Sequence, residues 1–147
     1  CFGQGGSMIL AQSCAHLFST ARPNFTAVWD SHLQAIAASQ LVEGDVVIYF
    51  SYSGSTQELV DNLKIVRDRG ASSILITRFP KSPGAAAADV VLQCGSREGP
   101  LQLGSIAARI AQLFLVDVLF SEVCRRDIEG CTARREMVAE VLSERHI

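Results

Sequence analysis

Short apolar runs alternate along the chain with longer segments of helical period. The runs are rich in β-branched and aromatic residues, as buried strands are, and they lie at Phe25–Trp29, Val46–Phe50, Ile74–Thr77 and Val90–Cys94. Segments long enough for several helical turns lie at Met8–Thr20, Ser31–Leu41 and Thr56–Arg69. Strands that alternate with helices predict parallel β-α units, in a sheet covered by helices on both faces.

The segment Thr56–Arg69 carries the clearest helical pattern. Its apolar residues form one stripe, which consists of Leu59, Val60, Leu63 and Val66. Ser55 is followed three residues later by Glu58, which is the capping-box pattern of a helix start, and Gly70 stands where a left-handed residue ends a helix. These signals predict both ends of the helix.

Two further helices are predicted after the last strand. The first, from about Gly104 to Glu122, is apolar on almost every side, so we expect it in the centre of the fold or at a subunit interface. The second, from Thr132 to His146, is amphipathic. The apolar helix favours a homodimer or a higher homo-oligomer.

Composition restricts the class of protein further. The chain has 147 residues, 48% of them apolar and 19% charged, which is typical of one globular domain over residues 1–147. Its net charge of −2 argues against direct binding of nucleic acid, which needs a basic face. No apolar stretch reaches the roughly 20 residues of a membrane span, and the residues Cys1–Gly6 have neither the positive region nor the apolar region of a secretory signal. We therefore expect a cytoplasmic protein without membrane contact.

The cysteines argue against a disulfide framework and against a metal site. There are five, at positions 1, 14, 94, 124 and 131, with no C-x-x-C pair and no histidine at ligand spacing. An odd count without such pairs predicts reduced thiols. We expect neither a metal nor a cofactor.

Two turns rich in glycine and serine each precede a predicted helix, at Gly3–Ser7 and Ser51–Thr56. In a doubly wound sheet, the turns at the carboxyl ends of neighbouring strands form the ligand crevice. The second turn suits an anion, because the N–H groups of a helix start lack partners and four hydroxyls within six residues add donors. It contains no lysine and so is not a Walker A site.

Two other interpretations of these turns stay open. The first turn loosely matches the G-x-G-x-x-G pattern of dinucleotide sites, with Asp30 as the acidic residue after the second strand. Alternatively, the glycines form tight turns and the serines cap helices without any ligand. The coincidence of two such turns favours ligand binding.

The second turn also carries a family resemblance. The run Gly44–Glu58 resembles the S-x-S-G-x-T turn of SIS (sugar isomerase) phosphosugar-binding domains, and the stretch Gly70–Thr77 agrees with it. The helix around Ala108–Leu113 and the run Asp30-Ser31-His32 most resemble the effector domains of RpiR-type bacterial transcriptional regulators. The resemblance implies an α/β fold: a three-layer, doubly wound parallel sheet of five strands in the flavodoxin-like order 2-1-3-4-5. Such domains bind a phosphorylated sugar and pair through their helices.

The resemblance also implies roles for individual residues. Ser51, Ser53 and Thr56 would bind the phosphate, with Ser55 close by, and Ser7 would contact the sugar. The first strand, which feeds the first turn, is truncated in this chain.

Three functions fit these residues. The first is a phosphosugar sensor in a regulator of sugar metabolism, whose DNA-binding domain would lie upstream of Cys1. The second is an aldose–ketose isomerase: in sugar isomerases of this fold a glutamate after the last strand is the acid/base, Glu98 occupies the corresponding loop, and His32 is a second candidate. The third is a dimerisation module without a ligand. We predict the sensor, because a loop glutamate beside Arg97 is usually a solvated surface charge.

Overall fold

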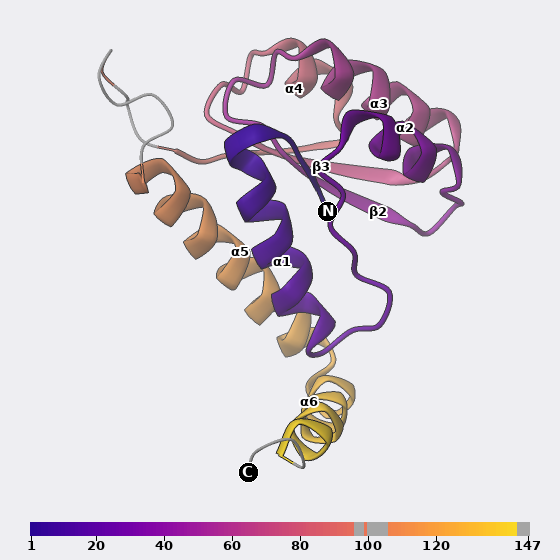
Figure 1. The fold of residues 1–147 in the computed structure, drawn as a ribbon, viewed down its shortest axis with the longest axis vertical. Coiled ribbons are helices and arrows are strands. Elements are labelled where there is room, and N and C mark those ends of the chain that lie inside the picture. Colours follow the sequence, from indigo (N-terminus) through magenta and orange to yellow (C-terminus); the bar gives the residue numbers. More distant parts are fainter. Residues whose placement is uncertain (96–98, 100–105, 144–147) are drawn as a thin grey trace.

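The computed structural model describes residues 1–95, 99 and 106–143, and in it strands and helices alternate along the chain (Figure 1). The strands are β1 (Phe2–Gly3), β2 (Val46–Phe50), β3 (Ser72–Thr77) and β4 (Val90–Gln93). The helices are the 3-10 turn η1 (Gly5–Ser7) and α1 (Met8–Ser19), α2 (Ser31–Ser39), α3 (Gln57–Asp68), α4 (Pro83–Ala87), α5 (Ile106–Arg126) and α6 (Ile128–Ser143).

The strands form one parallel sheet, as predicted, and over the described residues it has four strands in the order β1-β2-β3-β4. The predicted fifth strand does not form, because the segment Phe25–Trp29 makes only an isolated parallel bridge from Val28 to Phe2, and the predicted order 2-1-3-4-5 is therefore not confirmed. Two backbone hydrogen bonds join this segment to the first three residues. Val28 N–H donates to the Cys1 carbonyl at 2.8 Å, and Gly3 N–H donates to the Val28 carbonyl at 3.3 Å. A ladder this short does not make a strand.

Helices cover both faces of the sheet, with α1 and α5 on one side and α2 and α3 on the other (Figure 1). Side chains of a strand point alternately to its two faces. In β2, Ile48 and Phe50 therefore pack with α1 and α5, while Val47 and Tyr49 pack with α2 and α3. Each face of the sheet has its own apolar core, and the predicted three-layer α/β arrangement is confirmed.

Helix α3 differs from its prediction at its start and agrees with it at its end. The helix begins at Gln57, with Thr56 as the N-cap residue and no side-chain hydrogen bond at the cap, so the predicted capping box of Ser55 and Glu58 does not form. Gly70 follows the C-cap with a φ of +76°, the left-handed conformation predicted for it. The N-terminal turn of α3 is therefore left without a side-chain cap.

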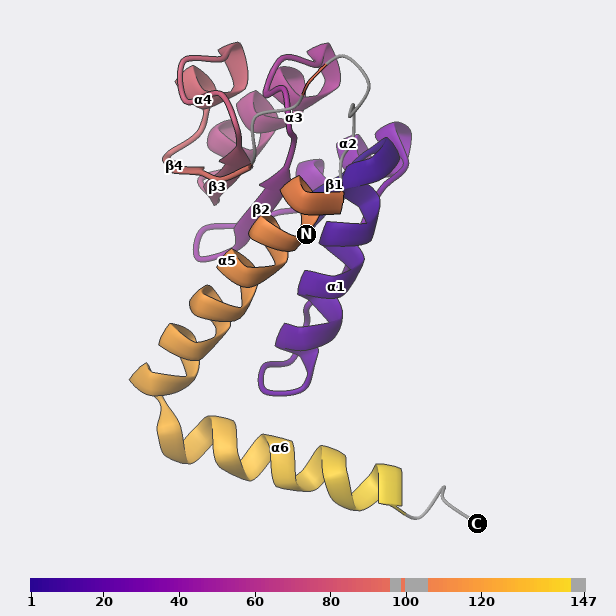
Figure 2. The same cartoon turned by 90° about the vertical axis from the view of Figure 1, so that its left-hand side faces the viewer.

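Helix α5 has apolar side chains on two opposite faces. One face packs into the core through the buried residues Ala108, Gln112, Val116 and Phe120. The opposite face is exposed, and we call its apolar residues the outer stripe: Ile106, Ile110, Phe114 and Val118. Helix α6 then turns away from the sheet and extends below it (Figure 2). Within the described residues, no helix is both long and apolar enough to cross a membrane.

Candidate functional site

The two glycine- and serine-rich turns meet at the carboxyl ends of β1 and β2. A cavity of about 230 Å³ lies between them. It is lined by Gln4 and Ser7 from the first turn, Tyr49 and Phe50 from β2, and Tyr52 together with the predicted site residues Ser51, Ser53 and Thr56 from the second. Because β1 and β2 are neighbours in a parallel sheet, their following turns lie side by side. The structure thus brings four predicted site residues to one cavity.

The second turn is fixed by its own hydrogen bonds. Ser51 Oγ accepts from the Gly54 N–H at 3.1 Å, and Ser53 Oγ accepts from the Ser55 N–H at 3.3 Å. The Ser55 hydroxyl in turn donates to the Ser53 carbonyl at 3.0 Å. Ser55 lies next to the cavity without lining it, since its hydroxyl bonds within the turn. These bonds set the backbone that aims the Ser51 and Ser53 side chains.

Gly54 is required at the centre of this turn for two reasons. Its φ is +62°, which L side chains rarely adopt. A Cβ there would also collide with the Ser82 hydroxyl, while its carbonyl accepts from the Gly84 N–H at 2.8 Å. The N-cap residue Ser82 and Gly84 of α4 therefore hold the turn in place.

The start of α3 has the features of an anion site. Thr56 is the N-cap residue, yet its hydroxyl makes no capping bond, and Ser53, Ser55 and Thr56 are all exposed. The first N–H groups of a helix lack intrahelical partners and carry the positive end of the helix dipole. Exposed hydroxyls and free N–H groups together can bind a phosphate. One acidic residue, Glu58, lies in the same first helical turn and opposes the binding of an anion.

The first turn is tight because glycine permits a close backbone approach. A Cβ at Gly3 would collide with the carbonyl oxygen of Ser7. The Ser7 N–H donates to the Gln4 carbonyl at 3.0 Å, which closes η1. Ser7 is half-buried and makes no capping bond at the start of α1. Ser7 lines the cavity, and a serine hydroxyl can both donate and accept a hydrogen bond to a ligand.

A buried polar network beneath the cavity is the part of the site that sequence reasoning missed. Gln34 of α2 is fully buried, and its Oε1 accepts from the Tyr49 hydroxyl at 2.8 Å, from Gln4 Nε2 at 3.1 Å and from Asn62 Nδ2 at 3.3 Å. Its own Nε2 donates to the Val28 carbonyl at 2.8 Å. The network joins the first turn to α2, β2 and α3.

Burial raises the pKa of the Tyr49 hydroxyl further above its ordinary value of 10.0. The hydroxyl therefore stays a donor to Gln34 at physiological pH. A signal for the network was present in the sequence: Gln34 and Asn62 stand among apolar residues on the inward stripes of their helices. A polar residue at such a position needs a buried partner.

Of the two remaining predicted residues, His32 does not line this cavity. His32 lies exposed in the first turn of α2, whose N-cap is Asp30. The Asp30 carboxylate accepts from the Leu33 N–H at 2.9 Å, so its position is explained by capping in place of the ribose contact that a dinucleotide site would need. Glu98 lies outside the described residues.

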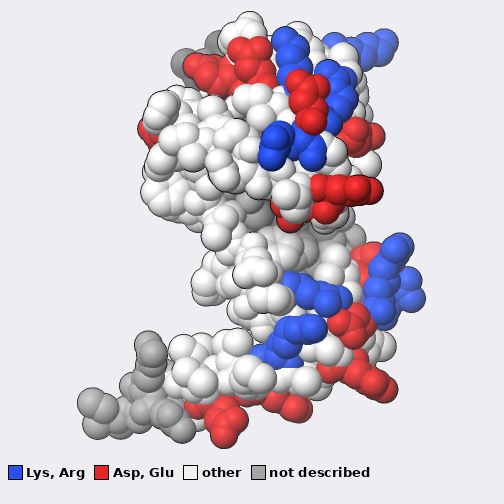
Figure 3. Space-filling model, turned by 90° about the vertical axis from the view of Figure 1, so that its right-hand side faces the viewer, with Lys and Arg blue, Asp and Glu red and all other residues white. Residues whose placement is uncertain are grey.

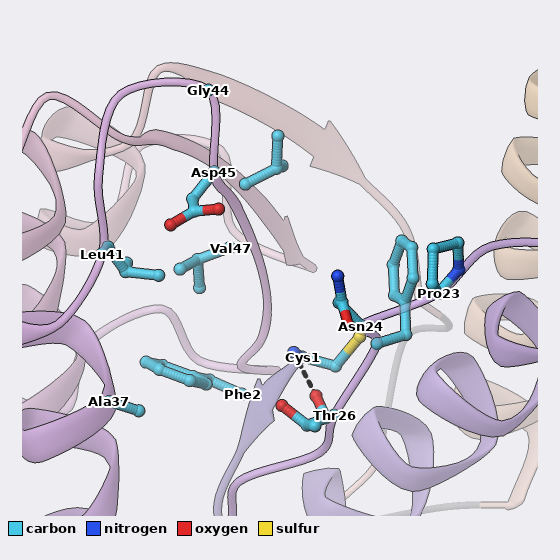
Figure 4. A pocket seen from close by; sticks show the side chains of 12 residues that line it. Cys1, Phe2, Pro23, Asn24, Thr26, Ala37, Leu41, Gly44, Asp45 and Val47 are labelled. Carbon is cyan, nitrogen blue, oxygen red and sulfur yellow. Dashed lines mark hydrogen bonds between the residues drawn. The ribbon is translucent and has the colours of Figure 1, made fainter.

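A second and larger cavity, of about 530 Å³, lies at the opposite ends of the strands (Figure 4). It opens between the segments Pro23–Thr26 and Gly44–Val47, because β1 pairs with β2 only at Tyr49 and Phe50. Its carboxylate, Asp45, accepts from the Val42 N–H at 2.9 Å. We assign the ligand site to the smaller cavity, since it has the clustered hydroxyls and lies at the carboxyl ends, where doubly wound sheets bind ligands.

The charged residues on one face of the molecule and the cysteines were the other candidates for a site. On the face drawn in Figure 3, Lys and Arg alternate with Asp and Glu and form no stripe of one sign. The five cysteines are free thiols, as predicted, and burial raises the pKa of Cys14 to about 11. Over the part of the chain that the structure describes, no group of His, Cys, Asp and Glu is placed to hold a metal ion.

Comparisons with known proteins agree with this arrangement. The family model of the SIS domain matches residues 1–122. An HTH-type transcriptional regulator of Caldanaerobacter subterraneus is 37% identical over 146 residues, which are 99% of this chain and 52% of that protein. The HTH-type transcriptional regulator RpiR of Escherichia coli K12 is 34% identical over 141 residues, 96% of this chain and 48% of that protein. The chain thus spans about half the length of these relatives.

A solved structure shares the fold over the whole chain. The Vibrio vulnificus NanR protein complexed with ManNAc-6P matches with a TM-score of 0.89 and 27% sequence identity, over 99% of this chain and 57% of that one. The resemblance expected from the second turn is confirmed.

Proposed function

The chain belongs to the SIS domain family, and we propose that it is the phosphosugar-binding sensor domain of an RpiR-type transcriptional regulator of sugar metabolism. The observation that carries this proposal is the cavity between the two turns, where Ser7, Ser51, Ser53 and Thr56 converge at the uncapped start of α3. The NanR protein, which shares the fold, is complexed with ManNAc-6P, and the two relatives described above are transcriptional regulators.

In this proposal the phosphate binds at the second turn. Ser51, Ser53 and Thr56 donate their hydroxyls, with Ser55 close by, and the N–H groups at the start of α3 complete the anion site. Ser7 contacts the sugar from the first turn. His32 is a further ligand contact, which a ligand extending beyond the cavity toward α2 would reach.

We infer that the domain senses its ligand without converting it. An isomerase needs a positioned acid/base to move a proton between adjacent carbons. The glutamate assigned to that role by family resemblance, Glu98, lies outside the described residues, and those described residues that line the cavity carry hydroxyl, amide and aromatic groups. The regulator names of the relatives support a binding role.

DNA binding in this proposal belongs to a separate domain of the whole protein. The chain spans about half the length of its HTH-type relatives. Its net charge is −2, and the face in Figure 3 carries mixed charges, whereas a DNA-binding surface is basic. A regulator of this kind acts in the bacterial cytoplasm.

The sensor acts as a homodimer or higher homo-oligomer in this proposal. The outer stripe of α5 exposes apolar side chains, with Ile106 at 72% and Phe114 at 70% exposure. Such residues spaced four apart form one ridge along a helix, and a self-complementary ridge suits a two-fold interface. The ligand would then shift the population of dimer arrangements.

The test is phosphosugar binding by the protein and by Ser53→Ala. We expect at least one of ManNAc-6P, glucose 6-phosphate and ribose 5-phosphate to raise the melting temperature by several degrees, since ligand at 100 times its Kd stabilises by about 2.7 kcal/mol. Ser53→Ala should remove the shift because it removes a phosphate donor. Ser39→Ala, an exposed serine of α2, is the matched control and should keep it.

Two results would contradict the proposal. One is no shift with any of the three phosphosugars; the other is an equal shift in Ser53→Ala. Exchange of deuterium from solvent into the bound phosphosugar, lost in Glu98→Gln and measured by NMR, would instead identify an isomerase.

A further inference from the structure

The phosphate site described above lacks a positive charge of its own. A phosphate monoester carries about −1.5 to −2 charges at pH 7. The turn Ser51–Thr56 contains no Lys or Arg, and Glu58 adds a negative charge in the first turn of α3. Hydroxyls and N–H groups can bind an anion, but a nearby cation strengthens such binding considerably. A cationic side chain close to the cavity would therefore strengthen phosphate binding.

Arg109 is such a side chain. It lies in the first turn of α5, which runs beside the start of α1 (Figure 2). Its guanidinium rests on Gly6, in the middle of the first turn, so closely that a Cβ built on Gly6 would be 3.0 Å from Nη2 and 3.7 Å from Cζ of Arg109. The next residue, Ser7, and the nearby Gln4 both line the cavity.

Gly6 leaves room for this contact. Its φ is not positive, so the backbone alone would accept any residue at this position. Gly6 is exposed, and what a side chain there would meet is the Arg109 guanidinium. Among the described residues, Arg109 makes no hydrogen bond or ion pair with another side chain. Its five N–H donors thus stand at the first turn without a protein partner from residues 1–95, 99 or 106–143.

We propose that Arg109 is a ligand-contacting residue that selects for anionic sugars, because its guanidinium lies over Gly6 of the first turn, beside the cavity-lining residues Gln4 and Ser7. The proposal rests on the phosphosugar site proposed above and deepens it. A planar guanidinium donates two parallel N–H bonds to a phosphate or carboxylate, so its contribution depends on both charge and geometry. Gly6 is the positioning residue that leaves room for it.

The experiment measures Kd by calorimetry for ManNAc-6P, glucose 6-phosphate and ribose 5-phosphate. The variants are Arg109→Met and Arg109→Lys, with Arg126→Met as the control that removes the same charge from an exposed position of the same helix. Arg109→Met should raise the Kd of the binding phosphosugar at least tenfold. The Kd of Arg109→Lys should lie between those of the wild type and Arg109→Met, because lysine keeps the positive charge but lacks the planar guanidinium. Arg126→Met should bind within twofold of the wild type.

Gly6→Ala provides a second, independent readout. A methyl group at Gly6 must push the guanidinium aside, so we expect a weaker Kd with an unchanged melting temperature in the absence of ligand. In the double variant with Arg109→Met, the Gly6 substitution should have no further effect, since its target is gone. Additive losses would show that Gly6→Ala acts through the turn itself.

The outcomes separate the two proposals. Wild-type protein that binds none of the three phosphosugars overturns the proposed function. Wild-type protein that binds one of them, with Arg109→Met binding it within twofold, leaves the sensor in place and overturns the role of Arg109. A tenfold weaker Kd in Arg109→Met together with an equally weakened Kd in Arg126→Met would show that only the net charge of the protein matters. This result would also overturn the role of Arg109.

Discussion

Two regions of the molecule differ in how far they bury their apolar side chains. One is the sheet with its covering helices, and the other, which we call the arm, consists of α6 and the outer stripe of α5. Around the sheet, large apolar side chains such as Leu59, Leu63 and Leu75 are fully buried. In the arm, Phe114 is 70% exposed and Met137 is 65% exposed. Cys131 is the buried residue of α6.

Helix α6 meets α5 at an elbow. Asp127, between α5 and α6, accepts from the Gly130 N–H at 3.1 Å and pairs with Arg22 at 2.9 Å and with Arg134 at 3.4 Å. These ion pairs are partly exposed and contribute little to stability. The sheet layers thus bury their large apolar side chains within one chain, whereas the arm leaves such side chains exposed, and the proposed homodimer would cover them.

The largest effect is expected from breaking the polar network inside the sheet layers. Gln34→Leu removes the acceptor of Tyr49, Asn62 and Gln4, and leaving buried polar groups without partners costs about 1–3 kcal/mol each. The free energy of unfolding, measured in urea, should fall by about 2–3 kcal/mol. Gln12→Leu, at an exposed position of α1, is the control and should change it by less than about 0.5 kcal/mol.

A loss below about 0.5 kcal/mol in Gln34→Leu would contradict this account. It would mean that water or a rearranged side chain accepts the hydrogen bond of the Tyr49 hydroxyl. The stability of this face of the sheet would then depend little on the buried network around Gln34.

A smaller effect on folding but a clear effect on assembly is expected from the arm. Phe114→Glu places a charge in the middle of the outer stripe, where a dimer would bury it. We expect the solution mass, measured by light scattering, to shift from dimer to monomer, with a weakening of association of about 2 kcal/mol or more. The far-ultraviolet circular dichroism should not change, because Phe114 makes no part of the core.

The matched control for this surface is Val42→Glu, an exposed apolar position between α2 and β2 with 57% exposure. It should leave the mass unchanged. A wild-type protein that is monomeric at high concentration, or a Phe114→Glu variant that stays dimeric, would refute the assignment of the outer stripe as an interface.

The smallest effect is expected from the charges at the end of α5. Arg125 and Arg126 donate to Glu122 and lower its pKa from 4.5 to about 2. A carboxylate whose folded-state pKa is lowered contributes stability above its unfolded pKa, and this contribution is lost as the pH falls from about 4.5 toward 2. All three residues are at the surface, so salt should weaken the effect.

The check is the difference in melting temperature between wild type and Glu122→Gln. It should be small, constant above pH 5, and shrink between pH 4.5 and pH 3. A difference that grows on acidification would reverse the sign and exclude these ion pairs as its source.

Local sequence patterns were sufficient to predict much of the fold and most of the candidate site. The strand segments around β2, β3 and β4 are apolar runs bounded by turn residues, and Gly70 ends α3 in the left-handed conformation. The hydroxyls of the second turn could be found for the same reason: Ser51, Ser53 and Thr56 lie within six residues, and bonds inside the turn fix them. Such features depend on neighbours in the chain.

Features that depend on distant partners could not be predicted in this way. The segment Phe25–Trp29 has the composition of a strand, but only a bridge forms, because a strand depends on how much backbone lies beside it. The start of α3 was misplaced by one residue, because Thr56 and Ser55 are both suitable caps and the turn uses the Ser55 hydroxyl internally.

The sequence by itself determined that this is a parallel α/β domain with two polar turns, because apolar periodicity and turn chemistry act over a few residues. Only the tertiary structure decided that Gln34 joins Gln4, Tyr49 and Asn62, and that Arg109 comes to rest on Gly6 about a hundred residues away along the chain. Contacts of that kind are set by how helices pack on the two faces of a sheet, which no local pattern specifies.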